Sequence, residues 1–296
     1  MKRFLKYIAF LFSSFFVRAN LISFGSLYAH KKSSFYKPAF LVNSVDEDTF
    51  DYIILGSSVG LTTLDTKQID SINNTNGVNL SMDDTGMSSQ YLMLKHFLAE
   101  GKKTKYCILA PGIAALENKN VNIGDNDYRF LMYGDRDYIS DYYKNADTFA
   151  SSVLYISKWL PLVGISYYNI ELFYPSLQAA LKPKSRNRFD DRGNYTYPKA
   201  NKKLKKREAK EQTLTFNHAY LDKIKALCQE NNIELIYYFA PIRGKSILYD
   251  QQEFTIINHT QLLKGEDIYF YDDIHVNNEG RKVVSAMFAD ELYRNN

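Results

Sequence analysis

Three residues of the types used in acyl transfer stand at two places where the chain is expected to leave a buried strand. Ser58 lies in the run Gly56–Gly60, directly after an apolar stretch. Asp272 and His275 follow another apolar stretch, with two residues between them. A serine hydroxyl becomes a nucleophile when a histidine accepts its proton and a carboxylate orients that histidine. The residue types and positions therefore predict a nucleophilic centre made of Ser58, His275 and Asp272.

Each of these residues also has a plainer interpretation. A serine after a strand commonly caps the helix that follows it, and Ser58 taken alone is equally consistent with both roles. A lone His275 would be read as a surface turn residue. The carboxylate of Asp272 three residues earlier, and a helix expected from Asn278, favour catalysis, because one turn can fold the carboxylate toward the imidazole.

The elements that must position these residues alternate along the chain. The expected strands are Asp51–Gly56, Gly77–Ser81, Lys105–Ala110, Ile233–Phe239 and Ile268–Tyr271. The expected helices are Met87–Glu100, Lys202–Asn231 and Asn278–Leu292, with helical patches in Asp137–Leu160. The first strand is apolar without alternation, which indicates burial on both faces. The pattern predicts an α/β three-layer sandwich with a mostly parallel sheet, and sites at the carboxyl ends of its strands.

Residues 1–30 are expected to be a signal or a membrane anchor. Three basic residues among the first six precede the uncharged stretch Tyr7–Val17, and Arg18 separates it from the uncharged Ala19–Ala29. The two stretches together are just long enough to span a bilayer, although Arg18 near the middle would cost about 2.5–3.5 kcal/mol. A cleaved signal, an interfacial helix and a core helix of a cytoplasmic protein stay open as alternatives to the anchor, which we favour.

The rest of the chain is expected to form a polar linker, residues 31–50, and one domain, residues 51–296. An irregular part at about 120–200, rich in Tyr, Pro and basic residues, predicts a helical or loop insertion in that domain. The net charge is only +4, and its excess is local, since residues 181–210 hold twelve Lys or Arg against three acidic residues. We therefore expect no nucleic-acid partner. The basic segment could contact anionic lipid or an acidic glycan, but we favour the interpretation that it is solvated.

Metal and cofactor chemistry find no support in the pattern. None of the remaining four histidines has a spacing to Cys, Asp or Glu that is typical of zinc ligands. Cys107 and Cys228 both lie in apolar or helical patterns, and we expect two buried free thiols rather than a disulfide, which the sequence leaves open. The prediction is a site with no metal and no cofactor.

The first and last motifs together resemble those of the SGNH, or GDSL-like, hydrolase superfamily. Gly56-Ser57-Ser58 is similar to its first block, and Asp272 and His275 are similar to its last block. The resemblance follows the layout of residues 50–296, although the specific motifs cover about a dozen positions. It implies a flavodoxin-like sandwich with Ser58 as nucleophile, His275 as base and Asp272 as its partner. The glycine pattern around Ser58 also fits the nucleophile elbow of α/β-hydrolases, but that elbow follows several strands, and its acid lies far from its histidine.

The chain departs from the superfamily in the two middle blocks, which supply oxyanion donors. Ser81 stands where a glycine is usual, with Gly86 slightly further on, and no asparagine follows the third expected strand until Asn118. The resemblance thus implies Ser58, Ser81, Gly86 and Asn118 as candidates for the oxyanion hole. Such departures are seen in variant members that resemble cell-envelope polysaccharide O-acetyltransferases and their accessory proteins.

The resemblance implies a serine esterase or an O-acyltransferase. The substrate would be an acylated glycan of the cell envelope or a small ester, with acetyl as the expected acyl group, and the reaction would pass through an acyl-serine. The protein would be membrane-anchored or secreted, on the exported side of a bacterial inner membrane, and would meet the membrane through its N-terminus. The alternative from another class is a non-catalytic SGNH-like domain that binds polysaccharide or scaffolds its biosynthesis or export.

Overall fold

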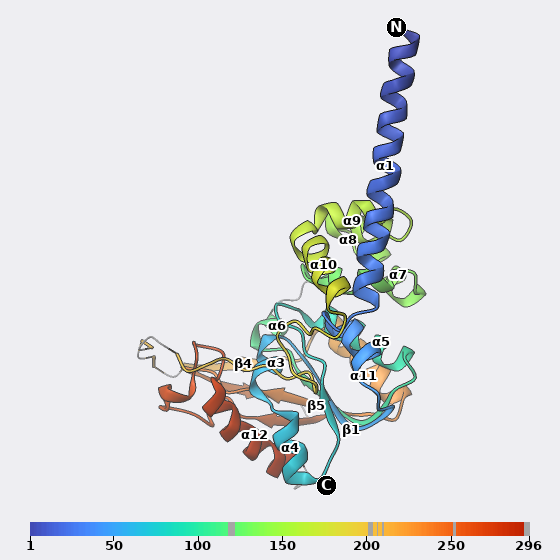
Figure 1. Ribbon diagram of the computed structural model, residues 1–296. Helices are drawn as coiled ribbons and strands as arrows, with labels where there is room; N and C mark the ends of the chain where they lie inside the picture. Colours follow the sequence, from blue (N-terminus) through green and yellow to red (C-terminus); the bar gives the residue numbers. More distant parts are fainter. Residues whose placement is uncertain (118–121, 201–203, 206, 209, 251–252, 293–296) are drawn as a thin grey trace. The chain divides into compact units, whose positions relative to one another are not determined.

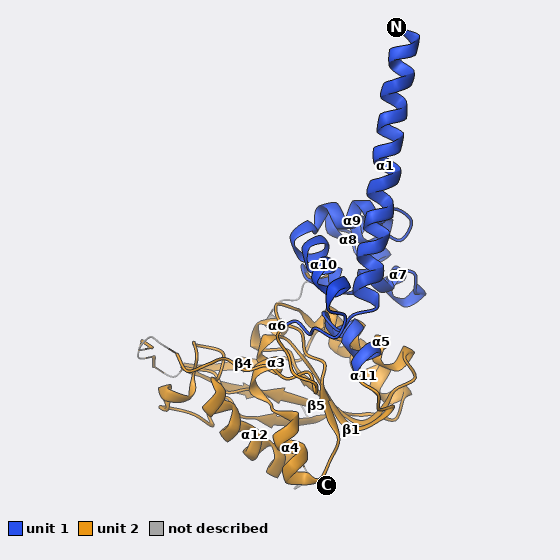
Figure 2. Ribbon diagram, viewed as in Figure 1, with its two compact units in different colours: residues 1–44, 125–187 blue, residues 45–124, 188–296 orange. Residues whose placement is uncertain are grey.

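The computed structural model describes residues 1–117, 122–200, 204–205, 207–208, 210–250 and 253–292 (Figure 1). The chain divides into two compact units (Figure 2). The helical unit comprises Met1–Ser44 and Asp125–Asn187, and the sheet unit comprises Val45–Gly124 and Arg188–Asn296.

The sheet unit is built on five strands that pair only in parallel. In spatial order the strands are β2 (Gly77–Asn79), β1 (Thr49–Gly56), β3 (Lys103–Ala110), β5 (Glu234–Phe239) and β7 (Thr255–Asn258). Two further strands, β4 (Lys210–Leu214) and β6 (Lys245–Tyr249), form a small parallel sheet of their own. The predicted α/β fold with a mostly parallel sheet is confirmed, and its helical insertion lies in the helical unit.

The apolar runs of the strands account for this arrangement. Tyr52 to Leu55 are all fully buried in β1, as expected for a strand covered on both faces. Figure 1 shows α4 (Thr66–Asn73) and α12 (Asn278–Leu292) on one side of the sheet, and α5 (Met87–Ala99) and α11 (Ala219–Glu230) on the other. The short elements α3 (Ser58–Thr63), α6 (Ile113–Glu117) and η3 (Asp267–Tyr269) complete the unit. Cys107 and Cys228 are both buried free thiols, as expected.

The helical unit is dominated by the 30-residue helix α1 (Lys2–Lys31). By length and composition this helix can cross a membrane. It contacts α9 and α10, and the neighbouring helices contact one another. The other elements of the unit are α2 (Lys37–Ser44), η1 (Asp127–Tyr133), α7 (Asp137–Lys144), α8 (Phe149–Ile156), α9 (Pro161–Tyr167), the π-helix η2 (Asn169–Phe173) and α10 (Tyr174–Leu181).

The strand expected at Ile268–Tyr271 is wrong. The chain there forms the 3-10 turn η3 and then a single bridge between Phe270 and Val276. The Asn277 side chain donates to the carbonyl oxygens of Ile268 (2.7 Å) and Phe270 (3.3 Å), so these oxygens are not available to a strand partner. The edge strand is β7 instead, which pairs with β5.

The long helix expected at Lys202–Asn231 is also wrong. Within the described residues of that range, Lys210–Leu214 is strand β4, and helix α11 begins only at Ala219, where the ring of His218 accepts the Tyr220 N–H at 3.1 Å. The charged start of the range has no apolar face to bury as a helix, whereas β4 gains a ladder with β6.

The polar linker expected at residues 31–50 contains helix α2. Five consecutive residues of that helix, from Lys37 to Leu41, are buried. The sequence Pro-Ala-Phe-Leu at its centre supplies an apolar segment that the prediction overlooked. The second part of the expected insertion, residues 188–200, belongs to the sheet unit rather than to the helical unit.

Candidate active site

Ser58 is held at the carboxyl end of β1 by a close approach of two backbones. A Cβ on Gly56 would lie 2.2 Å from the carbonyl oxygen of Ala110, so only glycine fits where β1 and β3 end side by side. The Ser57 N–H donates to the same oxygen at 3.3 Å. Ser57, not Ser58, caps helix α3, because its hydroxyl accepts the Val59 N–H. The Ser58 hydroxyl is therefore not engaged as a helix cap.

The three predicted residues form one chain of hydrogen bonds. His275 Nε2 lies 2.8 Å from Ser58 Oγ. The other ring nitrogen, Nδ1, lies 2.8 Å from Asp272 Oδ2 and 3.0 Å from Oδ1. These distances are within the range expected for a nucleophile, its base and the group that orients the base. His275 itself is 8% exposed, so solvent has limited access to the ring.

The Asp272 carboxylate is fixed by more than the histidine. Oδ1 also accepts the backbone N–H groups of Ile274 (2.9 Å) and His275 (2.8 Å). Partial burial raises the pKa of Asp272, but the hydrogen bonds from the His275 ring and from the Ile274 N–H outweigh it and hold the pKa below its ordinary value. The carboxylate is thus ionised at neutral pH. An ionised acceptor at Nδ1 favours the tautomer with the proton on Nδ1, which leaves Nε2 free to accept the Ser58 proton.

Arg243, which sequence reasoning missed, anchors the turn that carries this carboxylate. Its guanidinium donates to Asp267 (2.9 Å), to Asp273 (2.6 Å) and to the carbonyl oxygen of Lys205 (2.8 Å). Its backbone N–H donates to the carbonyl oxygen of Asp273 at 3.0 Å. The side chain is almost fully buried. The available sequence signal was its place just after β5, where the fourth predicted strand ends.

One ring of an aromatic pair packs against the histidine. The ring of Tyr197 lies with its centroid 5.1 Å from that of His275 and stacks on Tyr271 at 4.3 Å with an interplanar angle of 8°. The backbone of Tyr197 bridges to Asn277 and accepts the Asn278 N–H at 2.9 Å. This segment belongs to the stretch that sequence analysis treated as a basic insertion, so its part in the site was not foreseen.

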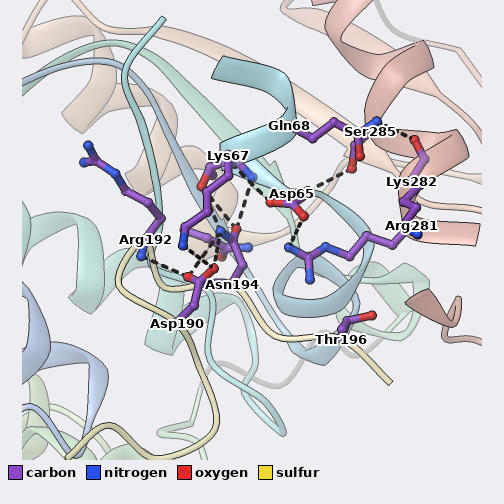
Figure 3. A network of polar contacts seen from close by, with 12 residues as sticks. Asp65, Lys67, Gln68, Asp190, Arg192, Asn194, Thr196, Arg281, Lys282 and Ser285 are labelled. Carbon is purple, nitrogen blue, oxygen red and sulfur yellow. Dashed lines mark hydrogen bonds and ion pairs between the residues drawn. The ribbon is translucent and has the colours of Figure 1, made fainter. Parts of the chain in front are cut away.

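A polar network holds in place residues 190–197, the segment that contains Tyr197 (Figure 3). The side-chain oxygen of Asn194 accepts the Thr66 N–H at 3.1 Å, and its amide donates to Thr66 Oγ1 at 2.9 Å. Asp190 accepts the backbone N–H of Asn194 at 2.9 Å. Asn194 and Thr66 are 2% and 0% exposed. The segment is therefore tied to the start of α4, beside the helix that carries Ser58.

The oxyanion candidates have different outcomes. The Ser58 N–H has no hydrogen-bond partner in the part of the chain that the structure describes, and remains a candidate donor. Ser81 is fully buried and its N–H donates to Asn79 Oδ1 at 3.0 Å, so it has no backbone donor left for an oxyanion. Gly86 is the residue before α5 and stays a prediction. Asn118 lies outside the described residues.

Among the described residues, no group of three or more His, Cys, Asp or Glu is placed to hold a metal ion.

No protein-family model matches the chain, and no curated protein matches it.

Proposed function

We propose that the protein is an SGNH-like serine esterase or O-acyltransferase. The observation that carries the proposal is the hydrogen-bonded chain from Ser58 through His275 to Asp272 at the carboxyl end of a parallel sheet. Ser58 Oγ attacks the acyl carbonyl while His275 Nε2 takes the hydroxyl proton, and Asp272 stabilises the imidazolium that forms. The alcohol leaves with the proton returned by His275, and water or a sugar hydroxyl then takes the acyl group from Ser58.

The proposed substrate is an acyl ester, acetyl in the first instance, of a cell-envelope glycan. Support for a location at the envelope comes from α1, which is apolar and long enough to act as an uncleaved anchor. Its first six residues include three basic ones, which favours a cytoplasmic N-terminus and an exported remainder of the chain. The hydrolase and the transferase share the acyl-serine and differ only in the acceptor.

One observation favours the non-catalytic alternative, a domain that binds polysaccharide or scaffolds its export. Ser81 replaces the glycine of the second block, and its N–H is already bonded to Asn79. Loss of one oxyanion donor typically costs 10²–10³-fold in rate. A site with only the Ser58 N–H would therefore be slow.

A serine-directed fluorophosphonate tests the proposal, because it reacts with an activated hydroxyl whatever the natural substrate is. We expect the full-length protein in detergent to be labelled at Ser58, as located by mass spectrometry, and to hydrolyse nitrophenyl acetate. The Ser58→Ala variant should lose both the fluorophosphonate labelling and the hydrolysis of nitrophenyl acetate. The matched control is Ser57→Ala, which removes only the helix cap, worth about 1 kcal/mol, and should still be labelled. A folded wild-type protein that takes no label at Ser58 would overturn the enzymatic proposal and favour the non-catalytic one.

A further inference from the structure

Helix α1 is free of other protein over residues 1–18, but the uncharged part of that stretch is short. The buried residues of α1 are Ser23, Ser26 and His30, all in its second half. The free, uncharged stretch Tyr7–Val17 is about 16 Å long at about 1.5 Å per residue, roughly half of the ~30 Å hydrocarbon core. If α1 crosses a bilayer, the part of it that packs against α9 and α10 must also lie at membrane depth.

The outward faces of these neighbouring elements are apolar. A stripe of five exposed side chains runs from the end of α9 through η2 and α10, at spacings of three and four residues, and we call it the outer stripe. Its members are Tyr167 (51% exposed), Ile170 (69%), Tyr174 (62%), Leu177 (52%) and Leu181 (84%). This is the reverse of a water-facing helix, whose outward face is polar.

The inward faces of the same elements are buried in the helical unit. Ile165, Leu172 and Ala179 are 5%, 0% and 1% exposed. The segment from α9 to α10 is therefore largely apolar on two opposite faces, as expected for helices that have protein on one side and an apolar medium on the other.

The outer stripe continues onto exposed apolar residues of neighbouring elements. The ring of Phe149, 73% exposed, lies 5.7 Å from that of Tyr167. On the second half of α1, Leu21, Phe24 and Tyr28 are each more than half exposed, although α1 there contacts α9 and α10. Apolar surface thus extends over α1 and its neighbours within a single unit.

We propose that α9, η2 and α10 form a collar that enters the membrane interface beside α1. The outer stripe then lies among headgroups and upper acyl chains, where tyrosine rings are favoured. The inference rests on α1 being a membrane anchor but not on the esterase activity. Apart from residues 1–18, the helical unit holds ten Lys or Arg against seven Asp or Glu, a net charge of +3, which suits a surface of anionic lipid.

The collar also explains how Arg18 can lie in a membrane-spanning helix. In a span made of residues 7–29 this arginine would lie near the middle of the hydrocarbon. With the collar in the interface, the hydrocarbon begins near the basic residues at the start of α1, and Arg18 lies toward the collar end, where its long side chain reaches polar groups.

A tryptophan reporter tests the inference directly, because Trp159 is the only tryptophan of the chain. In a Trp159→Phe background, Tyr174→Trp places the fluorophore on the outer stripe at an exposed position. The full-length variant is reconstituted in vesicles of phosphatidylcholine and phosphatidylglycerol, with and without brominated acyl chains. We expect emission shifted to shorter wavelength, quenched by the brominated lipid and protected from aqueous iodide. An emission typical of water, quenched by iodide alone, would show that the outer stripe does not enter the lipid and would overturn the collar. Because the vesicles contain no other protein, that result would leave a protein partner as the occupant of the outer stripe.

The matched control carries the reporter outside the helical unit. Ile72 on α4 is 49% exposed and belongs to the sheet unit. In the same Trp159→Phe background, Ile72→Trp should stay accessible to iodide and insensitive to brominated lipid. Equal quenching of both reporters by lipid would mean nonspecific adsorption and would also overturn the proposal. The triple substitution of Ile170, Leu177 and Leu181 by Gln, combined with the Tyr174→Trp reporter, should weaken the lipid quenching.

Discussion

At the scale of residues, the site depends on how firmly the turn from Asp272 to His275 is held. The carboxylate that orients the histidine is 43% exposed at its side chain, so hydrogen bonds within the turn, rather than burial, hold it in place. The buried Arg243 fixes the neighbouring Asp273 through side chain and backbone together. Arg243 touches none of the reacting atoms, and we regard it as a positioning residue.

Substitution of Arg243 should therefore slow the chemistry of Ser58 without removing any catalytic group. In Arg243→Gln we expect fluorophosphonate labelling to slow by about 10–100-fold, because a displacement near 1 Å can cost 10²-fold. The matched control is Arg207→Gln. Arg207 pairs with the same Asp273 from an exposed position, and surface ion pairs contribute about 0–1 kcal/mol. The control should therefore change the labelling rate by less than about 3-fold.

Two further measurements separate positioning from general damage. The downfield NMR signal of the His275 Nδ1 proton, bonded to Asp272, should weaken in Arg243→Gln and persist in Arg207→Gln. The buried thiols of Cys107 and Cys228 report whether the sheet unit stays folded. Unchanged labelling and an unchanged signal in a folded Arg243→Gln protein would contradict the role.

The residues that sequence reasoning found and missed differ in how they reach the site. Ser58 lies directly after strand β1, so its position follows from a strand end. Asp272 and His275 follow a 3-10 turn instead, and what identified them was the spacing of an aspartate three residues before a histidine. Arg243 and Tyr197 reach the site through long-range contacts with Asp273 and His275, and no local pattern encodes such contacts. The donor state of Ser81 likewise depends on the buried side chain of Asn79.

At the scale of elements, the segment that carries Tyr197 has no regular structure and is held by side chains instead. Asn194 satisfies both the N–H and the hydroxyl of the buried Thr66 at the start of α4. The same helix start receives an ion pair between Asp65 and Arg281 at 2.7 Å (Figure 3). The network therefore joins this segment to α4 and α12, and α12 contacts the Ser58 helix α3.

Removal of the Asn194 side chain should destabilise the sheet unit. Asn194→Ala leaves the buried Thr66 N–H without its acceptor, which typically costs about 1–3 kcal/mol. We expect that loss in urea unfolding followed by the reactivity of the two buried thiols. Asn231→Ala, which removes an exposed asparagine, should change stability by about 0.5 kcal/mol or less. Equal stability of the two variants would show that the network is dispensable.

The helices and strands were predictable from the sequence where their apolar residues form an uninterrupted buried run or face. The β1, β3 and β5 runs and helix α12 were recognised because an apolar pattern of the right period leaves few alternatives. Strand β4 was missed because four of its five residues are polar and the strand with which it pairs, β6, lies about thirty-five residues further along the chain. The strand expected at Ile268–Tyr271 failed because Asn277 binds the carbonyl groups that a strand needs.

At the scale of the whole molecule, the two units have opposite charge. The net charge is +7 for the helical unit and +4 for the whole chain, so the sheet unit carries a net charge of −3. This distribution was hidden in the sequence, because the helical unit joins two separated stretches of chain. The basic excess at residues 181–210 drew attention instead, and most of that segment belongs to the sheet unit.

The stability of the sheet unit should fall in weak acid because of one buried histidine. His259 is 3% exposed, with Tyr238 Oη at 3.2 Å from Nδ1 and a Glu291 carboxylate oxygen at 3.3 Å from Nε2. Burial lowers its pKa below the ordinary value near 6.5, and the attraction of Glu291 offsets this only in part. The folded protein therefore holds His259 neutral at a pH where the unfolded chain already binds a proton.

The consequence is a stability that is fully present above about pH 6.5 and is lost as the pH falls, by up to about 1.4 kcal/mol per pH unit for this one group. Urea unfolding at pH 7 and pH 5, followed with dithiodipyridine on the buried thiols, measures the loss. In His259→Gln the loss between the two pH values should be smaller, even though the variant is less stable at pH 7. Titrating groups that do not contact His259 contribute equally to both proteins, so the difference reports on His259 together with its partner Glu291. The same loss in variant and wild type would mean that Glu291 keeps His259 charged in the fold, because a group protonated in both states adds no dependence on pH.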